Sequence, residues 1–290
     1  MRSKTTIKEY LYQHLAQQSA DNYLYTINNF LKLHPKAKRY KYQQMVDHLA
    51  DVRQKYPNIQ TCIRILSALK KYYDFLVDTG QRTDHPCQKL TLKKGSDQSI
   101  QLQDLFTSTE LEMLMKRENR YRHLDDRNKV LISLMIYQGL TSDELIRLDV
   151  KTIDLDSGEV YVKASSKLER RTLSLRASQI LLFERYIHET RPKLKRCNTE
   201  KLILTKLGKP ITVDSIKAMV EPLGSLFPDR KLNPRTIRMS VISSCFNEKK
   251  MRLEDVQAFS GHKWPGTTEK YLKKDSGKQR ELINKYFPDM

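Results

Sequence analysis

The 290-residue chain has few cysteines, and they lie far apart. The four are Cys62, Cys87, Cys197 and Cys245. None belongs to a Cys-x-x-Cys pair or to a Cys/His cluster, so the sequence argues against a zinc motif and a disulfide framework and fits a reducing compartment. We therefore expect no metal site and no other cofactor.

Long apolar runs are missing as well. No stretch approaches the roughly 18 apolar residues that a membrane span needs, and the first ten residues have no apolar core of the kind that a secretory signal carries. There are no internal repeats and no low-complexity tracts. We expect a soluble cytoplasmic protein that does not bind membranes and is long enough for two domains with separate cores.

Acidic residues are scarce relative to basic ones. The chain has 53 Lys and Arg against 34 Asp and Glu, a formal net charge of +19 and a pI near 9.7. The excess is spread over both halves, since residues 1–92 hold 15 basic and 7 acidic side chains. Many proteins are basic, but two linked basic domains suit a clamp around duplex DNA, because phosphate contacts release counterions. Double-stranded DNA is the partner that this charge favours.

Four side chains near the end of the chain have the chemistry of a phosphate-cleaving site. Arg235 and Arg238 are three residues apart, so on a helix both guanidiniums face one side and can hold the oxygens of one phosphate. His262 follows a glycine, and Tyr271 comes nine residues later. A tyrosine that attacks a phosphodiester forms a covalent phosphotyrosine without a metal ion. The spacing predicts a phosphate clamp with an attached nucleophile.

This pattern resembles that of the tyrosine recombinases, or phage integrases. The family's His-x-x-Arg, Leu-Gly-His and Thr-Thr-x-x-Tyr motifs are similar to Arg235-Thr-Ile-Arg238, Ser-Gly261-His262 and Thr267-Thr268-Glu-Lys-Tyr271. Upstream, residues 137–145 resemble its Gly-Leu-Arg-x-x-Glu-Leu box, residues 160–175 its lysine-bearing β-hairpin, and residues 61–76 the end of its core-binding domain. The resemblance covers nearly the whole chain.

The resemblance implies a mainly α-helical fold with a small β-hairpin or sheet. A helical core-binding domain at 1–92 would bind DNA, the polar stretch 93–105 would link it, and a catalytic domain would follow at 106–290, ending in the tail 272–290. Helical spacing of apolar residues within 5–92 agrees with this. In the catalytic part, Thr107-Ser-Thr109-Glu110 is predicted to open a helix at Leu111. Further helices are predicted at 126–138 and, after a Thr141 capping box, at 142–148, and short strands at 160–162 and 172–175.

The resemblance also implies roles for single residues. Tyr271 would be the nucleophile, and Arg235, Arg238 and His262 would stabilise the pentavalent phosphate. Lys167 on the hairpin would protonate the leaving 5′-oxygen, with Lys163 as the second candidate for that role. The candidate DNA contacts are the basic residues Arg64, Lys70, Lys71, Lys163 and Arg171.

Two departures from the family pattern touch catalysis. Thr141 stands where the family has its first catalytic arginine, and Arg235 stands where it has histidine. A comparable site that loses one such donor loses roughly 3–4 kcal/mol of transition-state stabilisation. We favour Arg235 as the substitute charge; the other candidates are Arg147, Arg170 and Arg171.

The function expected from these residues is site-specific DNA recombination of the integrase type, through a 3′-phosphotyrosyl intermediate. Two alternatives stay open: a catalytically impaired DNA-binding accessory protein of the same fold, and a nicking-closing enzyme of the topoisomerase type. The tail carries a small apolar face, and in the family such a tail docks on a neighbouring protomer. That implies a homotetramer on paired DNA sites.

Overall fold

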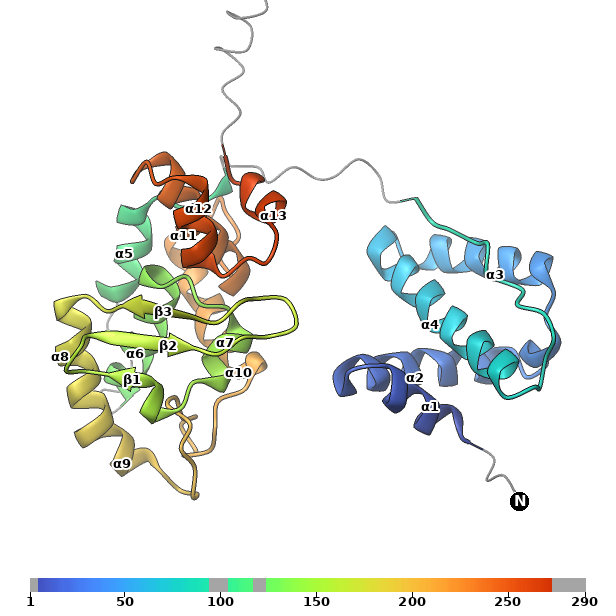
Figure 1. Ribbon diagram of the computed structural model, residues 1–290, viewed down its shortest axis with the longest axis horizontal. Coiled ribbons are helices and arrows are strands. Elements are labelled where there is room, and N and C mark those ends of the chain that lie inside the picture. The colour runs from blue at the N-terminus through green and yellow to red at the C-terminus, as the bar shows by residue number, and fades with distance from the viewer. Residues whose placement is uncertain (1–4, 94–103, 117–123, 273–290) are drawn as a thin grey trace, which may run out of the picture. The chain divides into compact units, whose positions relative to one another are not determined.

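A computed structural model of the chain describes residues 5–93, 104–116 and 124–272. The chain divides into two compact units, 1–98 and 99–290 (Figure 1). Most of the predicted linker 93–105 and of the tail 272–290 lies outside the described residues. The domain bounds 1–92 and 106–290 therefore stay predictions.

The first unit is helical, as predicted for residues 5–92. It contains α1 (Ile7–His14), α2 (Gln17–Leu33), a 3₁₀ turn (Ala37–Arg39), α3 (Tyr42–Lys55) and α4 (Ile59–Asp78). Apolar residues three or four apart on α4, among them Leu66, Leu69, Tyr73 and Leu76, are buried against the other helices. The Tyr73 hydroxyl is satisfied inside this core by the carbonyl of Ala37, 2.8 Å away.

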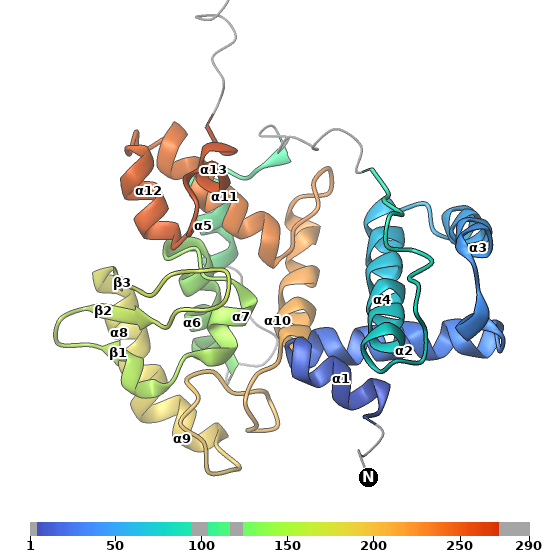
Figure 2. The same cartoon turned by 45° about the vertical axis from the view of Figure 1, so that its right-hand side comes forward.

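The second unit surrounds one small sheet. Its elements are α5 (Ser108–Lys116), α6 (Asp125–Tyr137), α7 (Ser142–Arg147), a 3₁₀ turn (Val150–Thr152), β1 (Ile153–Asp154), β2 (Glu159–Val162), β3 (Arg171–Ser174), α8 (Ala177–Arg185), a π-helical turn (Tyr186–Thr190), α9 (Arg191–Leu194), α10 (Val213–Val220), a 3₁₀ stretch (Glu221–Leu226), α11 (Pro234–Asn247), α12 (Leu253–Ser260) and α13 (Pro265–Glu269). In Figures 1 and 2, α11, α12 and α13 lie together on the β3 side of the sheet. Within the described residues, no helix is long and apolar enough to cross a membrane.

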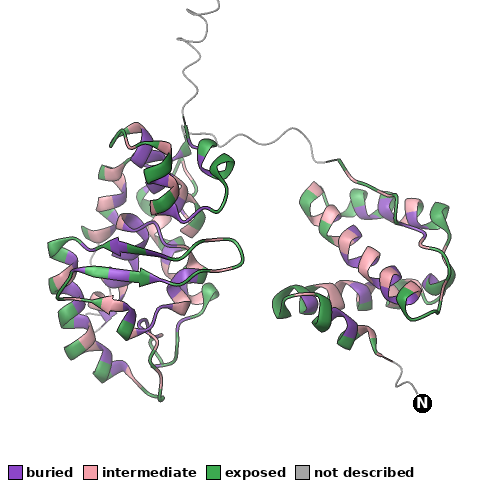
Figure 3. Cartoon of the chain, in the orientation of Figure 1, coloured by how far each residue is buried: buried purple, intermediate pink, exposed green. Residues whose placement is uncertain are grey.

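The sheet is antiparallel in the order β1-β2-β3. Val160 pairs with Leu173, and Val162 pairs with Arg171. Side chains alternate between the two faces of a strand, and burial alternates with them along β2 and β3 (Figure 3). The inward-facing residues are Val160, Val162, Leu173 and Arg171. An arginine thus occupies a core-facing position at the start of β3.

Most predicted elements of this unit are confirmed, and one boundary is wrong. α6, α7, β2 and β3 match the predicted segments within one or two residues. The helix predicted to begin at Leu111 begins at Ser108 instead. Thr107 is its cap, because the Thr107 hydroxyl accepts from the Glu110 amide at 3.2 Å and the Glu110 carboxylate accepts from the Thr107 amide at 2.8 Å.

Candidate active site

A buried carboxylate on α7 has partners from Thr141, from Arg171 of β3 and from Arg238 of α11. Glu144 lies on α7 and its side chain is fully buried. Its Oε2 accepts from the amide and the hydroxyl of Thr141 at 2.9 and 3.0 Å. Thr141 thereby forms the predicted capping box of α7. The other carboxylate oxygen is left for charged partners from elsewhere in the fold.

Arg171 is the partner of that second oxygen. Its Nη1 donates to Glu144 Oε1 at 2.6 Å, and only 5% of the Arg171 side chain is exposed. Its Nε and Nη2 are buried and have no acceptor among the described residues. A buried donor without a partner costs about 1–3 kcal/mol. Two such donors on one guanidinium therefore carry an unusually large desolvation penalty for a folded core.

Arg238, on α11, lies on the other side of the carboxylate. Its Nη1 is 3.7 Å from Glu144 Oε2 and donates to the Gly139 carbonyl at 2.6 Å, while its Nη2 donates to the Ser260 carbonyl at 2.7 Å. Burial and the nearby Arg171 charge lower the pKa of Arg238, and Glu144 partly offsets them. Arg238 thus ties the ends of α6 and α12 to the centre of the site.

His262 follows α12 through a left-handed turn. Gly261 has φ +71°, a conformation that glycine adopts at no steric cost. His262 then pairs with Leu168 of the hairpin loop, and the Glu169 amide donates to the Gly261 carbonyl at 2.8 Å. The His262 Nδ1 is 2.9 Å from the hydroxyl of Thr268. This arrangement fixes the ring and leaves Nε2 for another group.

Tyr271 stands next to this ring. The two ring centroids are 6.3 Å apart with the planes at 17°, and Tyr271 is 9% exposed, packed with Ile242, Phe246 and Val256. Burial raises the pKa of the Tyr271 phenol, while the charges of Arg238 and Arg235 act against that rise. The structure therefore brings Tyr271, His262 and Arg238 together.

Three other predicted site residues of this unit are exposed. Arg235 lies on the first turn of α11 and reaches the site only through its charge on Tyr271. Lys167 lies in the loop between β2 and β3, next to Leu168, which pairs with His262. The ammonium of Lys163 is 2.8 Å from Asp149, which also binds Lys201. Because Lys163 is already held, Lys167 is the better candidate for a proton donor.

The candidate DNA contacts of the first unit all lie on α4. Arg64 is exposed. Lys70 donates to the Gln88 carbonyl, and Lys71 is paired with Asp74, both at 2.9 Å. Lys70 and Lys71 are therefore partly occupied within the unit, and Arg64 has the side chain that is most open to a phosphate.

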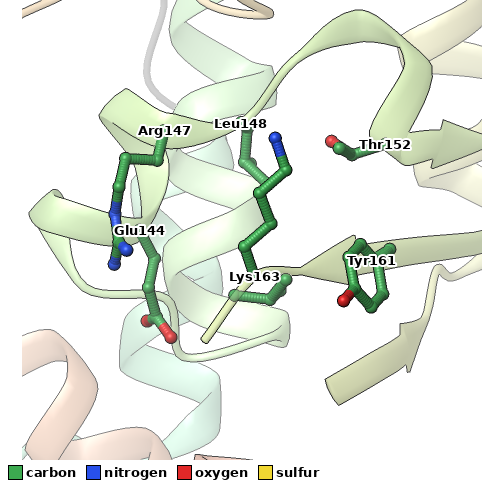
Figure 4. A pocket seen from close by; sticks show the side chains of 7 residues that line it. Glu144, Arg147, Leu148, Thr152, Tyr161 and Lys163 are labelled. Carbon is green, nitrogen blue, oxygen red and sulfur yellow. The ribbon is translucent and has the colours of Figure 1, made fainter. Parts of the chain in front are cut away.

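A small pocket adjoins Glu144. Figure 4 shows Glu144 and Arg147 on its α7 side and Tyr161 and Lys163 on its β2 side. Arg147 is paired with Asp143 at 2.7 Å, as Lys163 is with Asp149. Both cations are thus already neutralised, so the pocket is a poor phosphate site. Among the residues that the structure describes, no three His, Cys, Asp or Glu side chains gather as metal ligands would.

Two protein-family models match the chain. Residues 104–278 match the model of the phage integrase family, and residues 3–80 match its N-terminal SAM-like domain. The chain belongs to the phage integrase family. The resemblance seen in the motifs and the mainly α-helical fold are confirmed.

Individual relatives agree with this assignment. Tyrosine recombinase XerC of Lactobacillus delbrueckii subsp. bulgaricus is 28% identical over 217 residues, 73% of this chain and 71% of the relative. Tyrosine recombinase XerD of Staphylococcus aureus is 26% identical over 248 residues, 85% and 81% of the two chains. The structure of XerH site-specific recombinase bound to difH substrate, a pre-cleavage complex, matches the fold with a TM-score of 0.74 at 18% identity, covering 97% and 84%.

The burial of Arg171 is the main feature of the site that the motifs do not predict. From the sequence, Arg171 is a candidate DNA contact and one of three further candidates for the missing arginine, and the structure places it inside the cluster beside Glu144. A signal was present in the sequence. In Arg171-Thr-Leu-Ser, the apolar Leu173 marks the inward face of the strand, and Arg171 shares that face by the period of two.

We expect His262 to remain neutral in the free protein down to about pH 5. Burial, with the charges of Arg238 and Arg171, lowers its pKa to about 4. The unfolded chain binds that proton near the ordinary histidine pKa of about 6.5. The contribution of neutral His262 to the free energy of unfolding is therefore fully present above pH 6.5. It is lost as the pH drops towards 4, by on the order of 2–3 kcal/mol.

Chemical denaturation between pH 7 and 4 measures this effect, and NMR titration of the His262 ring locates the pKa. His262→Gln is the reference, because it lacks the titrating group. A wild-type curve parallel to that of the Gln variant would contradict the expectation.

Proposed function

We propose that this protein is a site-specific DNA recombinase of the tyrosine class, which cuts and rejoins duplex DNA through a 3′-phosphotyrosyl intermediate. The observation that carries the proposal is the convergence of Tyr271, His262 and Arg238 from three separate segments on one buried site. A nucleophile beside a phosphate-binding charge is the arrangement that phosphoryl transfer requires.

The chemistry follows from the groups present. The Tyr271 hydroxyl gives up its proton to solvent as its oxygen attacks the scissile phosphorus, and the bond from phosphorus to the 5′-oxygen breaks as the new bond forms. Lys167 gives a proton to the leaving 5′-oxygen. The phosphotyrosyl bond stores the energy of the broken linkage, so attack by another strand's 5′-hydroxyl reverses the steps and rejoins DNA without ATP.

Electrostatics favours the charged species along this path. Arg238 and Arg235 both act to lower the pKa of the Tyr271 phenol against the effect of burial, so they stabilise the phenolate as its proton leaves. Arg238 also offers a positive charge to the pentavalent phosphate. The neutral His262 ring can use Nε2 for a single hydrogen bond to the same group.

The surroundings of the site support DNA as substrate. The formal charge of +19 supplies sequence-independent affinity, and the XerH structure that shares the fold holds its difH DNA. With this function we also propose action in the cytoplasm and assembly as a tetramer on two DNA sites. Arg64, Lys70 and Lys71 on α4 are the proposed backbone contacts of the first unit.

Covalent trapping tests the proposal. DNA recovered with the protein from cells supplies the site, and a nicked duplex of that sequence releases a short strand after cleavage, so the adduct accumulates. We expect a protein–DNA adduct stable to denaturant, and exchange of strands between two such duplexes. Tight binding without adduct would instead mean an accessory DNA-binding protein; adduct without exchange would mean a nicking-closing enzyme.

A further inference from the structure

We propose that Arg171 is a catalytic residue, which grips the scissile phosphate with Nε and Nη2 and supplies the guanidinium that Thr141 does not. The inference rests on the proposed function, since it names a residue for the same reaction. It replaces Arg235, the substitute that the sequence favoured, by a residue from β3.

The donors of Arg171 are only partly used inside the chain. Nη1 is held by Glu144, whereas Nε and Nη2 are buried without an acceptor. Other buried arginines of this unit are satisfied: Arg191 donates from Nε and Nη2 to backbone carbonyls at 2.8–3.1 Å. Adjacent Nε and Nη2 donors match two oxygens of one phosphate. The unused pair at Arg171 therefore indicates an acceptor that arrives with the substrate.

The charges around Glu144 point the same way. Two guanidiniums, of Arg171 and Arg238, share a single buried carboxylate. Burial raises the pKa of Glu144, but the hydrogen bond and charge of Arg171, a backbone amide hydrogen bond and the charge of Arg238 together lower it below its ordinary value, so Glu144 stays ionised. One positive charge is therefore left over in a desolvated site, next to Tyr271 and His262. An anionic phosphodiester compensates that charge.

Thr141 and Gly261 are both suited to an arginine that comes from β3. Thr141 occupies Glu144 Oε2 and leaves Oε1 to Arg171. A Cβ on Gly261 would lie 2.6 Å from Arg171 Nη1, so the guanidinium would have to shift from its present position. The absence of a side chain at Gly261 thus makes room for this guanidinium, and the inward register of β3 delivers it.

The rival arginines do not reach the carboxylate. Arg235 and Arg170 are exposed. Arg147 is paired with Asp143 and donates to the Asp143 and Ala164 carbonyls. The Arg171 donors are enclosed in the free protein, and so is the rest of the site: Arg238, His262 and Tyr271 are also less than a tenth exposed. DNA must open the whole cluster, and hydrogen bonds of this kind tighten in the substrate complex.

Arg171→Ala tests the inference in the covalent trapping assay. We expect adduct formation to fall by about 10²–10³-fold, with DNA affinity changed by less than about threefold. Arg171→Lys restores the charge without the planar fork, so a partial recovery of about tenfold is expected. Arg127→Ala is the matched control, a buried arginine that donates to the Leu204 carbonyl away from the site; it should keep wild-type cleavage.

A substrate with a neutral methylphosphonate at the scissile position separates contact with phosphate from support of Glu144. A neutral linkage does not need the charge of Arg171. On the methylphosphonate substrate, cleavage by Arg171→Ala should therefore come close to cleavage by the wild type. The double variant Arg171→Ala/Glu144→Gln removes the unpaired carboxylate, and melting curves establish that it folds. We expect this variant to stay inactive on ordinary phosphate.

Three results are decisive against these expectations. If Arg171→Ala cleaves at the wild-type rate, the inference about Arg171 is wrong and the proposed function stands. If the double variant Arg171→Ala/Glu144→Gln regains cleavage of ordinary phosphate, and methylphosphonate does not rescue Arg171→Ala, then Arg171 is a positioning residue and the inference is also wrong. A wild-type chain that binds its site and never forms adduct overturns the proposed function, and the inference with it.

Discussion

Replacing Tyr271 with Phe is expected to abolish the covalent adduct, a loss of roughly 10⁴-fold or more, while the fold and DNA affinity persist. The hydroxyl is the attacking group, so no reaction remains without it. The ring packs on Ile242, Phe246 and Val256, and Phe keeps that packing. Denaturing gels of the trapping reaction measure the adduct, and mobility shifts measure DNA binding.

Tyr186→Phe is the matched control for this experiment. Tyr186 is fully buried in the same unit, and its hydroxyl donates to the Leu202 carbonyl at 2.9 Å. Its loss leaves a buried carbonyl unpaired, which should reduce the free energy of unfolding by about 1–3 kcal/mol without affecting cleavage. Adduct formed by Tyr271→Phe at the wild-type rate would disprove the nucleophile assignment.

Local signals in the sequence predicted the elements well. Helical spacing of apolar residues predicted the helices of residues 5–92, and alternation predicted β2 and β3. The capping box of Thr141 and Glu144 is present as predicted. Thr107-Ser-Thr109-Glu110 was predicted to open α5, but the first helical residue is Ser108 and not Leu111, because the cap is Thr107 and the helix begins directly after it.

The site itself was predictable only where its residues follow a recognisable motif spacing. Arg238, His262 and Tyr271 have such a spacing, and it carries the chemistry. Contact of Arg171 with Glu144 joins residues 27 apart, and it depends on strand register and on the pairing of Leu168 with His262. No local pattern encodes that pairing. The sequence likewise does not predict that Lys70, Lys71 and Lys163 have hydrogen-bond or ion-pair partners within the chain.

Arg238→Ala is expected to have the second largest effect, because Arg238 both binds the phosphate and holds the site together. Its loss should lower adduct formation by about 10³-fold or more. The carbonyls of Gly139 and Ser260 lose their donors, and Glu144 loses one of its two cations. We expect the free energy of unfolding to fall by about 3 kcal/mol.

Arg238→Lys separates these two losses. A lysine keeps the charge beside Glu144 but cannot reach the Gly139 and Ser260 carbonyls with one planar fork, so stability should fall almost as far as in the Ala variant. Cleavage should fall less, by roughly 10²-fold, since the phosphate still meets a positive charge. Denaturant unfolding and the trapping assay, each compared with the buried-arginine control Arg127→Ala, measure the two effects. If Arg238→Ala were to cleave as fast as Arg127→Ala, then Arg238 would act on stability alone, and the phosphate would have to be held by Arg171 and His262.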